Sequence, residues 1–153
     1  MTKIRLNSAI AGNGFTLLEI ILSISLIGVL AGLSVPVYNS FQARNDMDNA
    51  AGTIAQVLGR AEIIAASGKE DSSWSVKIEP GQLTLFKGVD FFNRDQAFDE
   101  ILQLPSGINV TGLDEFGFQK FTGSPTVTGT STITDSSGEA RSIGVHPGGM
   151  IDH

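Results

Sequence analysis

One apolar segment near the start of the chain limits what the rest can fold into. Residues 15–37 hold a single ionisable side chain, Glu19, in a run of about twenty apolar or small residues, enough for a helix to cross the ~30 Å core of a bilayer. A carboxylate in such a run costs roughly 2.5–3.5 kcal/mol to insert, so its presence indicates a function. The preceding residues carry Lys3 and Arg5 and no acid.

The junction Gly14-Phe15-Thr16-Leu17-Leu18-Glu19, with its basic leader and apolar run, resembles the N-terminus of type IV pilins and pseudopilins. In that family a prepilin peptidase cuts after the glycine, and the new N-terminal residue is N-methylated. The glutamate at the fifth mature position then serves in assembly. The resemblance therefore implies cleavage between Gly14 and Phe15, N-methylation of Phe15 and an assembly role for Glu19.

A proline also fits this resemblance, because Pro36 falls at a position where many family members carry one. Proline lacks a backbone donor, so we expect Pro36 to kink or loosen the helix without ending it.

Two ordinary interpretations compete with this one. A secretory signal peptide has an apolar region of roughly 7–15 residues and a small-residue cleavage site at its end. The run here is longer, contains an acid, and has no convincing site of that kind after it. A plain membrane anchor would accept Lys3 and Arg5 on the cytoplasmic side, but it would not explain an acid four residues after Phe15. The plain anchor is the more serious alternative.

Composition excludes several classes of function. The net charge of −6 argues against general capture of nucleic acid, which needs clustered Lys and Arg. The chain has no cysteine, so disulfides, thiol catalysis and thiolate metal sites are ruled out. The sequence contains no Ser-His-Asp context and no glycine-rich phosphate loop, and we predict that the protein is not an enzyme and uses no cofactor.

After Tyr38 the sequence becomes amphipathic, with apolar residues at spacings of three and four that predict one buried helix face. That face comprises Met47, Ala50, Ala51, Ile54, Val57, Leu58, Ala61, Ile64 and Ala65. Ser67-Gly68 is a helix stop.

From Ser73 the apolar period changes to two, which predicts β-strands. The expected strands and turns are a strand around Trp74–Ile78, a turn at Pro80-Gly81, a returning strand around Leu83–Phe86, short strands near Ile108 and Phe116, and a final hairpin of 126–134 and 141–145 that closes the sheet. The segment 88–105 is less regular, with Phe91, Phe92 and Phe98 among several charged residues, and no strand is assigned to it.

The order of these elements resembles the H-type minor pseudopilins and the FimT-type minor pilins. We therefore predict an α+β fold, a long N-terminal helix packed on a mostly antiparallel β domain. The predicted segments are a leader at 1–14, a membrane and assembly helix at 15–37, its amphipathic continuation at 38–68, and a β-rich domain at 69–153.

Other candidate sites are weak. His146 and His153 are the only histidines, and no cysteine or neighbouring histidine accompanies either of them, so we predict no metal site. Asp95, Asp99 and Glu100 lack the spacing of an EF-hand. Asn109-Val110-Thr111 fits a glycosylation sequon, a pattern that is frequent by chance.

The leading hypothesis is a minor pilin or pseudopilin, anchored once in a bacterial inner membrane with its domain in the periplasm. Its expected partners are prepilin peptidase and the other pilins of a helical filament, in a pilus, a secretion pseudopilus or a competence pseudopilus. The first alternative is a DNA-uptake or adhesive subunit. A basic patch made from Lys69, Lys77, Lys87, Arg94, Lys120 and Arg141 would favour it. The second alternative is an anchored periplasmic domain that never polymerises.

Overall fold

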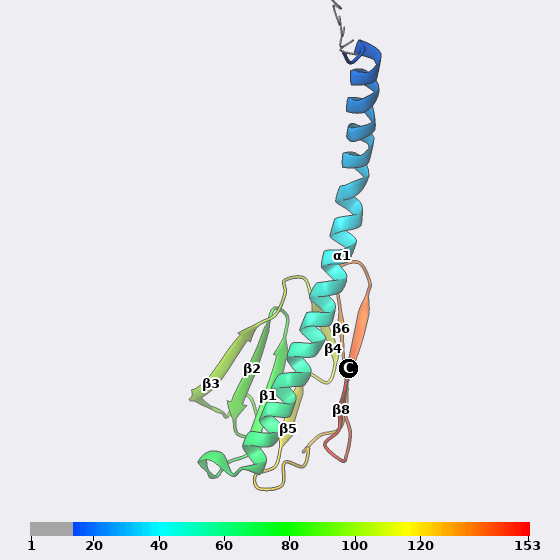
Figure 1. The fold of residues 1–153 in the computed structure, drawn as a ribbon. Helices are drawn as coiled ribbons and strands as arrows, with labels where there is room; N and C mark the ends of the chain where they lie inside the picture. The colour runs from blue at the N-terminus through cyan, green and yellow to red at the C-terminus, as the bar shows by residue number, and fades with distance from the viewer. Residues whose placement is uncertain (1–13) are drawn as a thin grey trace, which may run out of the picture. The chain divides into compact units, whose positions relative to one another are not determined.

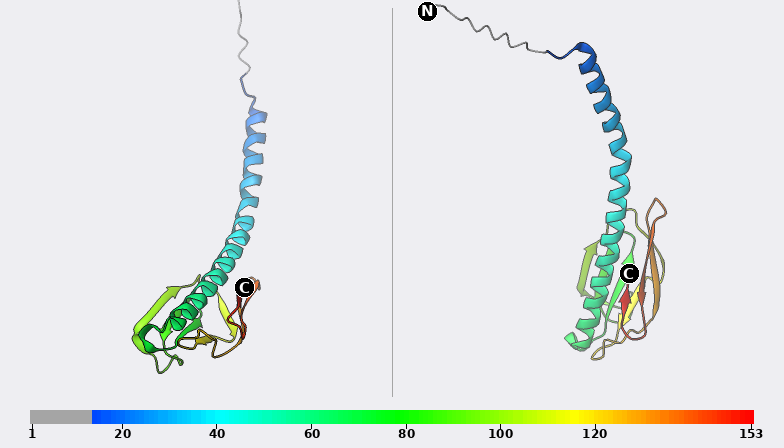
Figure 2. Two further views of the ribbon diagram at one scale, coloured as in Figure 1. Left: turned by 60° about the horizontal axis from the view of Figure 1, so that its bottom comes forward. Right: turned by 45° about the vertical axis from the view of Figure 1, so that its right-hand side comes forward.

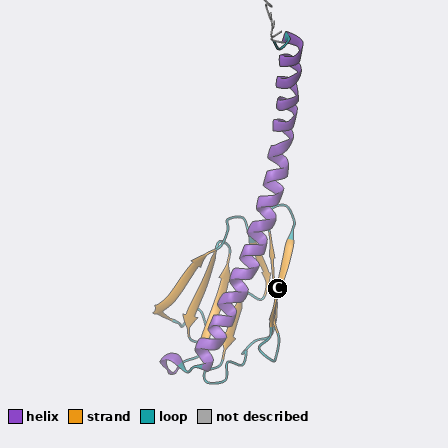
Figure 3. Ribbon diagram, viewed as in Figure 1, coloured by secondary structure: helices purple, strands orange, loops and turns teal. Residues whose placement is uncertain are grey.

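The computed structural model describes residues 14–153, with the backbone alone described for 33–40. It divides into two compact units, Met1–Asn39 and Ser40–His153. The predicted leader lies outside the described residues except for Gly14. Within the described residues, one helix is followed by a short 3-10 turn and eight strands. Figures 1 and 3 show how the helix is followed by the strands. Their bounds are α1 Leu17–Ala66, η1 Lys69–Asp71, β1 Trp74–Glu79, β2 Gln82–Lys87, β3 Asp95–Gln103, β4 Asn109–Gly112, β5 Glu115–Phe118, β6 Gly129–Thr134, β7 Ala140–Val145 and β8 Ile151–Asp152.

The strands of the second unit form two sheets where the sequence led us to expect one. One four-stranded sheet has the order β3-β2-β1-β5 and the other the order β4-β6-β7-β8. All pairings within them are antiparallel. The prediction of an α+β fold with an antiparallel β domain is confirmed, and the prediction of a single sheet was wrong.

The core of the second unit is formed by residues of α1 and of both sheets. Figure 2 shows the helix of this unit packed against the strands. Eight of the nine predicted helix positions are buried, and Ile64 is partly buried against the same core. Aromatic residues of sheet β3-β2-β1-β5, Trp74, Phe116 and Phe118, meet Ile133 and Ile143 of the other sheet in this cluster. The period of three and four thus identified the packed face of the helix correctly.

The helix ends where the sequence indicated. α1 stops at Ala66, and Gly68 adopts a left-handed φ of 70° while its N–H donates to the carbonyl of Ala65 at 3.0 Å. Phe121 also donates its N–H to that carbonyl, at 2.8 Å. A Cβ on Gly68 would lie 2.5 Å from the Phe121 ring, so both the conformation and the space require glycine.

The strand β3 lies in the segment 88–105, which is less regular in sequence and to which no strand was assigned. It has nine residues and forms the free edge of its sheet beside β2 (Figure 1). Its register on β2 shifts between Leu85 and Lys87. The terminal strand β8, paired with β7, was also missed.

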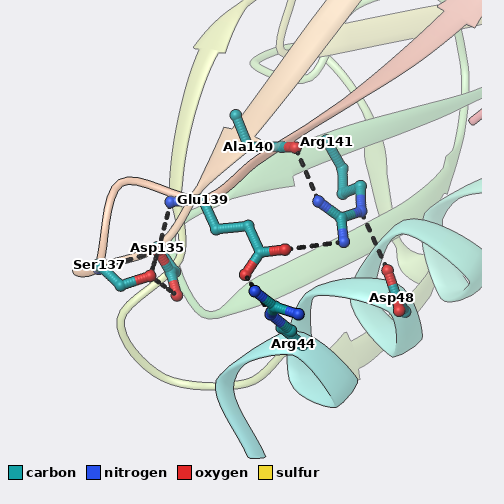
Figure 4. Close-up of polar contacts among 7 residues, drawn as sticks. All are labelled: Arg44, Asp48, Asp135, Ser137, Glu139, Ala140 and Arg141. Carbon is teal, nitrogen blue, oxygen red and sulfur yellow. Dashed lines mark hydrogen bonds and ion pairs between the residues drawn. The ribbon is translucent and has the colours of Figure 1, made fainter. Parts of the chain in front are cut away.

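Ion pairs tie α1 to the β6–β7 hairpin (Figure 4). Arg141 donates from Nε to Asp48 on the helix and from a terminal nitrogen to Glu139, both at 3.0 Å. Arg44 lies 3.8 Å from the second oxygen of Glu139. The hairpin is therefore held to the helix by charge as well as by its buried residues.

Candidate functional site

The first turn of α1 is capped by a side chain from its own sequence. Thr16 precedes the helix, and its Oγ1 accepts a hydrogen bond from the backbone N–H of Glu19 at 3.2 Å. A threonine in this N-cap position satisfies one of the four N–H groups that have no partner inside a helix. The Glu19 carboxylate belongs to the same turn, where negative charge interacts favourably with the helix dipole. The cap therefore fixes the point at which the helix begins and places Glu19 within its first turn.

Gly14 and Phe15 lie just before this cap and are both exposed, Phe15 to 79%. A Cβ built on Gly14 would meet no atom of the described residues within 4 Å. The space around position 14 among the described residues would therefore admit a side chain.

The N-terminal half of α1 presents large apolar side chains to solvent on every side. From Phe15 to Leu30 all of them are between 49% and 79% exposed: Phe15, Leu17, Leu18, Ile20, Ile21, Leu22, Ile24, Leu26, Ile27, Val29 and Leu30. Single exposed apolar residues are normal on a soluble monomer, but a continuous surface of this kind marks contact with lipid or with other protein chains.

The two serines in this apolar stretch are internally satisfied. Ser23 Oγ donates to the carbonyl of Glu19, and Ser25 Oγ donates to that of Ile21, both at 2.7 Å. A hydroxyl bonded to the carbonyl one turn earlier needs no water, so these residues add little cost when the helix leaves water. Among the residues whose placement is described, Glu19 is therefore the one strongly polar side chain of this surface.

Within the part of the chain that is described, no helix contains a stretch that is both long and apolar enough to cross a membrane. The membrane segment predicted at 15–37 stays a prediction. Pro36 and its predicted kink fall in 33–40, whose side chains lie outside the described residues.

The other candidate residues are dispersed. Asp99 pairs with Arg94, and Glu100 pairs with Arg60 of α1. In residues 14–153, apart from the side chains of 33–40, no group of three or more His, Cys, Asp or Glu residues is arranged to hold a metal ion. Asn109 begins β4 and is exposed.

The two histidines have separate surroundings. His146 Nε2 lies 3.1 Å from the Asp152 carboxylate across the β7–β8 hairpin. His153 lines an open pocket of about 240 Å³ together with Asp48, Ala51 and Arg141.

Five of the six basic residues that could form a patch are neutralised locally. Each has a carboxylate within 3.8 Å: Lys77, Lys87, Arg94, Lys120 and Arg141. The sixth, Lys69, has its Nζ 5.4 Å from the centroid of the Trp74 ring. These six side chains do not make the clustered positive surface that phosphate binding requires.

One element of the site was missed in the sequence. Thr16 and Glu19 form the spacing of a capping box, a threonine followed three residues later by a glutamate ahead of an apolar run. That spacing alone would have identified Thr16 as the cap.

Comparison with known proteins shows similarity to type IV fimbrial proteins. No family model matches the chain. A fimbrial protein of Pseudomonas aeruginosa is 33% identical over 60 residues, which make up 39% of this chain and 39% of that protein. The type IV major fimbrial protein FimA of Dichelobacter nodosus is 26% identical over 98 residues, or 64% of this chain and 61% of that protein. The chain thus matches between about two fifths and three fifths of the length of these relatives.

The fold resembles a solved structure from a secretion machine, the minor pseudopilin EpsH of the type 2 secretion system of Vibrio cholerae. The two agree with a TM-score of 0.51 over 70% of this chain and 94% of that one, at 12% sequence identity. At this identity the likeness concerns the fold alone. The chain is therefore similar in sequence to type IV fimbrial proteins and in fold to a minor pseudopilin, which confirms the resemblance to the type IV pilin and pseudopilin family.

Proposed function

We propose that this protein is a minor subunit of a type IV pilus or of a secretion pseudopilus. The observation that carries the proposal is the surface of α1 from Leu17 to Leu30, which is apolar on all sides and begins at a capped turn holding one carboxylate. A helix of this composition needs an apolar environment. Lipid supplies it before assembly, and the helices of neighbouring subunits supply it in a filament.

Cleavage after Gly14 would add a positive charge, the amine of Phe15, to the negative charge of Glu19. Cleavage by prepilin peptidase would free the amine of Phe15 one residue before the cap, and N-methylation would keep that amine basic. Because the described residues leave space for a side chain at 14, we assign the demand for a small residue there to the peptidase.

Glu19 would then select the position of the neighbouring subunit. A carboxylate left unpaired among apolar helices costs several kcal/mol, and pairing with the amine of an adjacent Phe15 removes much of that cost. The pair sets the axial register, whereas apolar packing supplies most of the cohesion. Each Leu or Ile side chain of this surface that becomes fully buried on assembly would stabilise the filament by roughly 1.5–3 kcal/mol.

The positive leader would place the N-terminus on the cytoplasmic side of the inner membrane and the β domain in the periplasm. A minor role is supported by the fold likeness to the minor pseudopilin EpsH and by the absence of cysteine for a C-terminal disulfide loop, whereas the sequence relatives include a type IV major fimbrial protein. The pairing of the basic residues with carboxylates disfavours the alternative of a DNA-uptake subunit.

The decisive experiment is intact mass measurement and N-terminal sequencing of the protein from native membranes. We expect a chain that begins at N-methylated Phe15. A mature chain that still carries residues 1–14 would refute the proposal and leave a plain membrane anchor. Sheared filament fractions, probed for the same mass, would show whether the processed chain is incorporated.

A further inference from the structure

An aromatic row runs out of the outer face of the sheet β3-β2-β1-β5, away from the main core. Phe86 of β2 is fully buried, and its ring centroid lies 5.5 Å from that of Phe91 in the loop 88–94. The Phe91 ring in turn lies 6.2 Å from that of Phe92, and both contacts are edge-to-face. Phe92 is 90% exposed, the most exposed large apolar side chain among the described residues. The row therefore connects a buried ring to one that is almost free in solvent.

The middle of the row is firmly held. The N–H of Phe91 donates to Glu115 of β5 at 3.2 Å, and Arg94 donates from a terminal nitrogen to the Phe91 carbonyl at 2.6 Å. The Arg94 guanidinium also lies 3.7 Å from the Phe91 ring centroid, and its Nε contacts both oxygens of Asp99 at 2.9 and 3.1 Å. These bonds come from the loop itself and from two strands, so they fix the backbone that carries Phe92.

The tip of the loop is also ordered by its own residues. Asp90 accepts the N–H of Phe92 at 3.1 Å with one oxygen and the side-chain amide of Asn93 with the other. An exposed ring on a loop that is already in one conformation loses little conformational entropy on binding. Nothing in these contacts shields the Phe92 ring from water, so the loop is arranged to present it.

The cations near the loop are engaged by carboxylates or by aromatic rings. Lys87, which lies opposite Asp95 in the β2–β3 pairing, has its Nζ 3.8 Å from Glu70 and 4.2 Å from the centroid of the Phe98 ring. Asp95 is exposed and Asp90 partly exposed, whereas the side chain of Arg94 is 15% exposed and is neutralised by Asp99. Lys77 lies beneath the row, 5.8 Å from the Phe91 centroid and 14% exposed. Burial lowers the pKa of Lys77, but its hydrogen bond to Asp114 and the neighbouring carboxylates outweigh this and raise the pKa above its ordinary value. Each of these cations is thus engaged by a carboxylate, and the Asp90 carboxylate, which accepts the N–H of Phe92, lies beside that residue.

We propose that Phe92 is the anchor of a docking surface for a partner protein that offers an apolar socket bordered by Lys or Arg. An aromatic anchor in a desolvated pocket accounts for much of the binding energy of protein interfaces, and complementary charges at the rim fix the partner and its orientation. The same carboxylates disfavour an anionic lipid surface. The proposal uses only residues of the second unit and does not depend on processing or on polymerisation.

The test is site-specific photocrosslinking in cells that produce the full-length chain. Benzoylphenylalanine replaces Phe92 in one variant and Phe121 in a matched control, because Phe121 is also an exposed phenylalanine on a loop of the same unit, at 64%. We expect one discrete protein adduct from position 92, at least ~tenfold stronger than the same adduct from position 121. Mass spectrometry should map it to a peptide with apolar residues and a nearby Lys or Arg.

A charge variant provides the second readout. Asp90→Asn with Asp95→Asn keeps an acceptor oxygen at both positions and removes the negative rim, so the adduct from position 92 should weaken roughly three- to tenfold. Several outcomes would each overturn the proposal. The adduct could form with lipid or with a second copy of this chain, or no protein adduct could form at all. The adduct could also be equally strong at both positions, or be unchanged in the charge variant. The intact mass of the chain in the same cells reports processing separately, so a failure here leaves the proposed filament role untouched.

Discussion

Arg141 of β7 donates from Nε to the carboxylate of Asp48 on α1 at 3.0 Å, a contact between residues 93 positions apart (Figure 4). The same guanidinium donates to Glu139 and to the carbonyl of Ala140, each at 3.0 Å. Its donors are therefore shared between the helix and the hairpin, and the pairing raises its pKa through Glu139 first and Asp48 second. This residue fastens the second sheet to the helix at the surface.

Replacement of Arg141 by alanine should lower the free energy of unfolding by more than the loss of a single surface pair, because its guanidinium joins two carboxylates and a backbone carbonyl. Arg44→Ala is the matched control, since Arg44 has a 67% exposed side chain and one ion pair at 3.8 Å. It should cost less than about 0.3 kcal/mol. Urea unfolding, followed by the fluorescence of the single tryptophan Trp74, measures both. Equal losses would show that Arg141 has no special role.

The buried face of α1 gives a second prediction. Ile54 is fully buried and Ile63 on the same helix is 70% exposed. Ile54→Ala should cost about 2–5 kcal/mol through lost transfer energy and a cavity, whereas Ile63→Ala should change stability by no more than about 0.5 kcal/mol. The same urea titration compares the two variants. A small loss for Ile54→Ala would mean that the helix is not packed on the sheets as described.

The β7–β8 hairpin should make stability depend on pH. The hydrogen bond from His146 holds the pKa of Asp152 below its ordinary value. A folded-state pKa below the unfolded one stabilises the fold above about pH 4, and this contribution is lost as the pH falls through the folded-state pKa. Asp152→Asn should therefore flatten the fall in stability between about pH 5 and pH 2.

Asp135 offers an independent check on that pH dependence, since Ser137 lowers its pKa in the β6–β7 turn by a hydrogen bond. The two carboxylates lie in different hairpins, so their effects should add. The double variant Asp135→Asn with Asp152→Asn should therefore show a smaller fall in stability at low pH than either single variant. Urea midpoints measured across the pH range would detect this. If the variants lose stability at low pH as steeply as the unmodified protein does, these carboxylates do not cause the pH dependence.

The sequence predicted the parts of the fold that follow from local periodicity. The helix face from Met47 to Ala65 repeats at three and four, and the strands around Val76 and Leu85 alternate at two, so both were identified. The strand β3 was missed because its inward residues Phe98 and Leu102 are separated by Glu100. An acid at an inward position is explained by its ion pair with Arg60 of α1, a residue 40 positions earlier that local periodicity cannot bring beside Glu100.

Strand partners and the Phe92 surface lay beyond sequence reasoning for a similar reason. Strand β1 pairs with β5 across a long stretch of chain, and nothing local in either strand specifies that pairing or the division into two sheets. The exposed ring of Phe92 depends on contacts to Glu115 and Asp99 from two other strands. In contrast, Gly14, Phe15 and Glu19 were chosen from adjacent residues, and their proposed roles remain predictions.

Processing gives the fourth prediction. Gly14→Val should abolish cleavage, because a branched side chain would fill the space that the peptidase needs. Gly12→Val, the same change two residues upstream in the leader, is the matched control and should still be cleaved. Intact masses of both proteins from native membranes decide the matter. Recovery of a chain that begins at Phe15 from Gly14→Val would contradict the proposed cleavage site.

Glu19→Gln separates the charge of Glu19 from its place in the helix. The backbone N–H that Thr16 caps at 3.2 Å is unchanged by this substitution, and the side chain keeps its length. We expect normal processing and a normal domain, but a fall of at least ~tenfold in incorporation into filaments, because the amine of the neighbouring Phe15 then has no counter-charge. Thr16→Ser, which keeps the capping hydroxyl, is the control and should be incorporated normally. Quantification of each variant in sheared filament and membrane fractions measures the effect. Normal incorporation of Glu19→Gln would exclude the carboxylate–amine pair as the basis of subunit register.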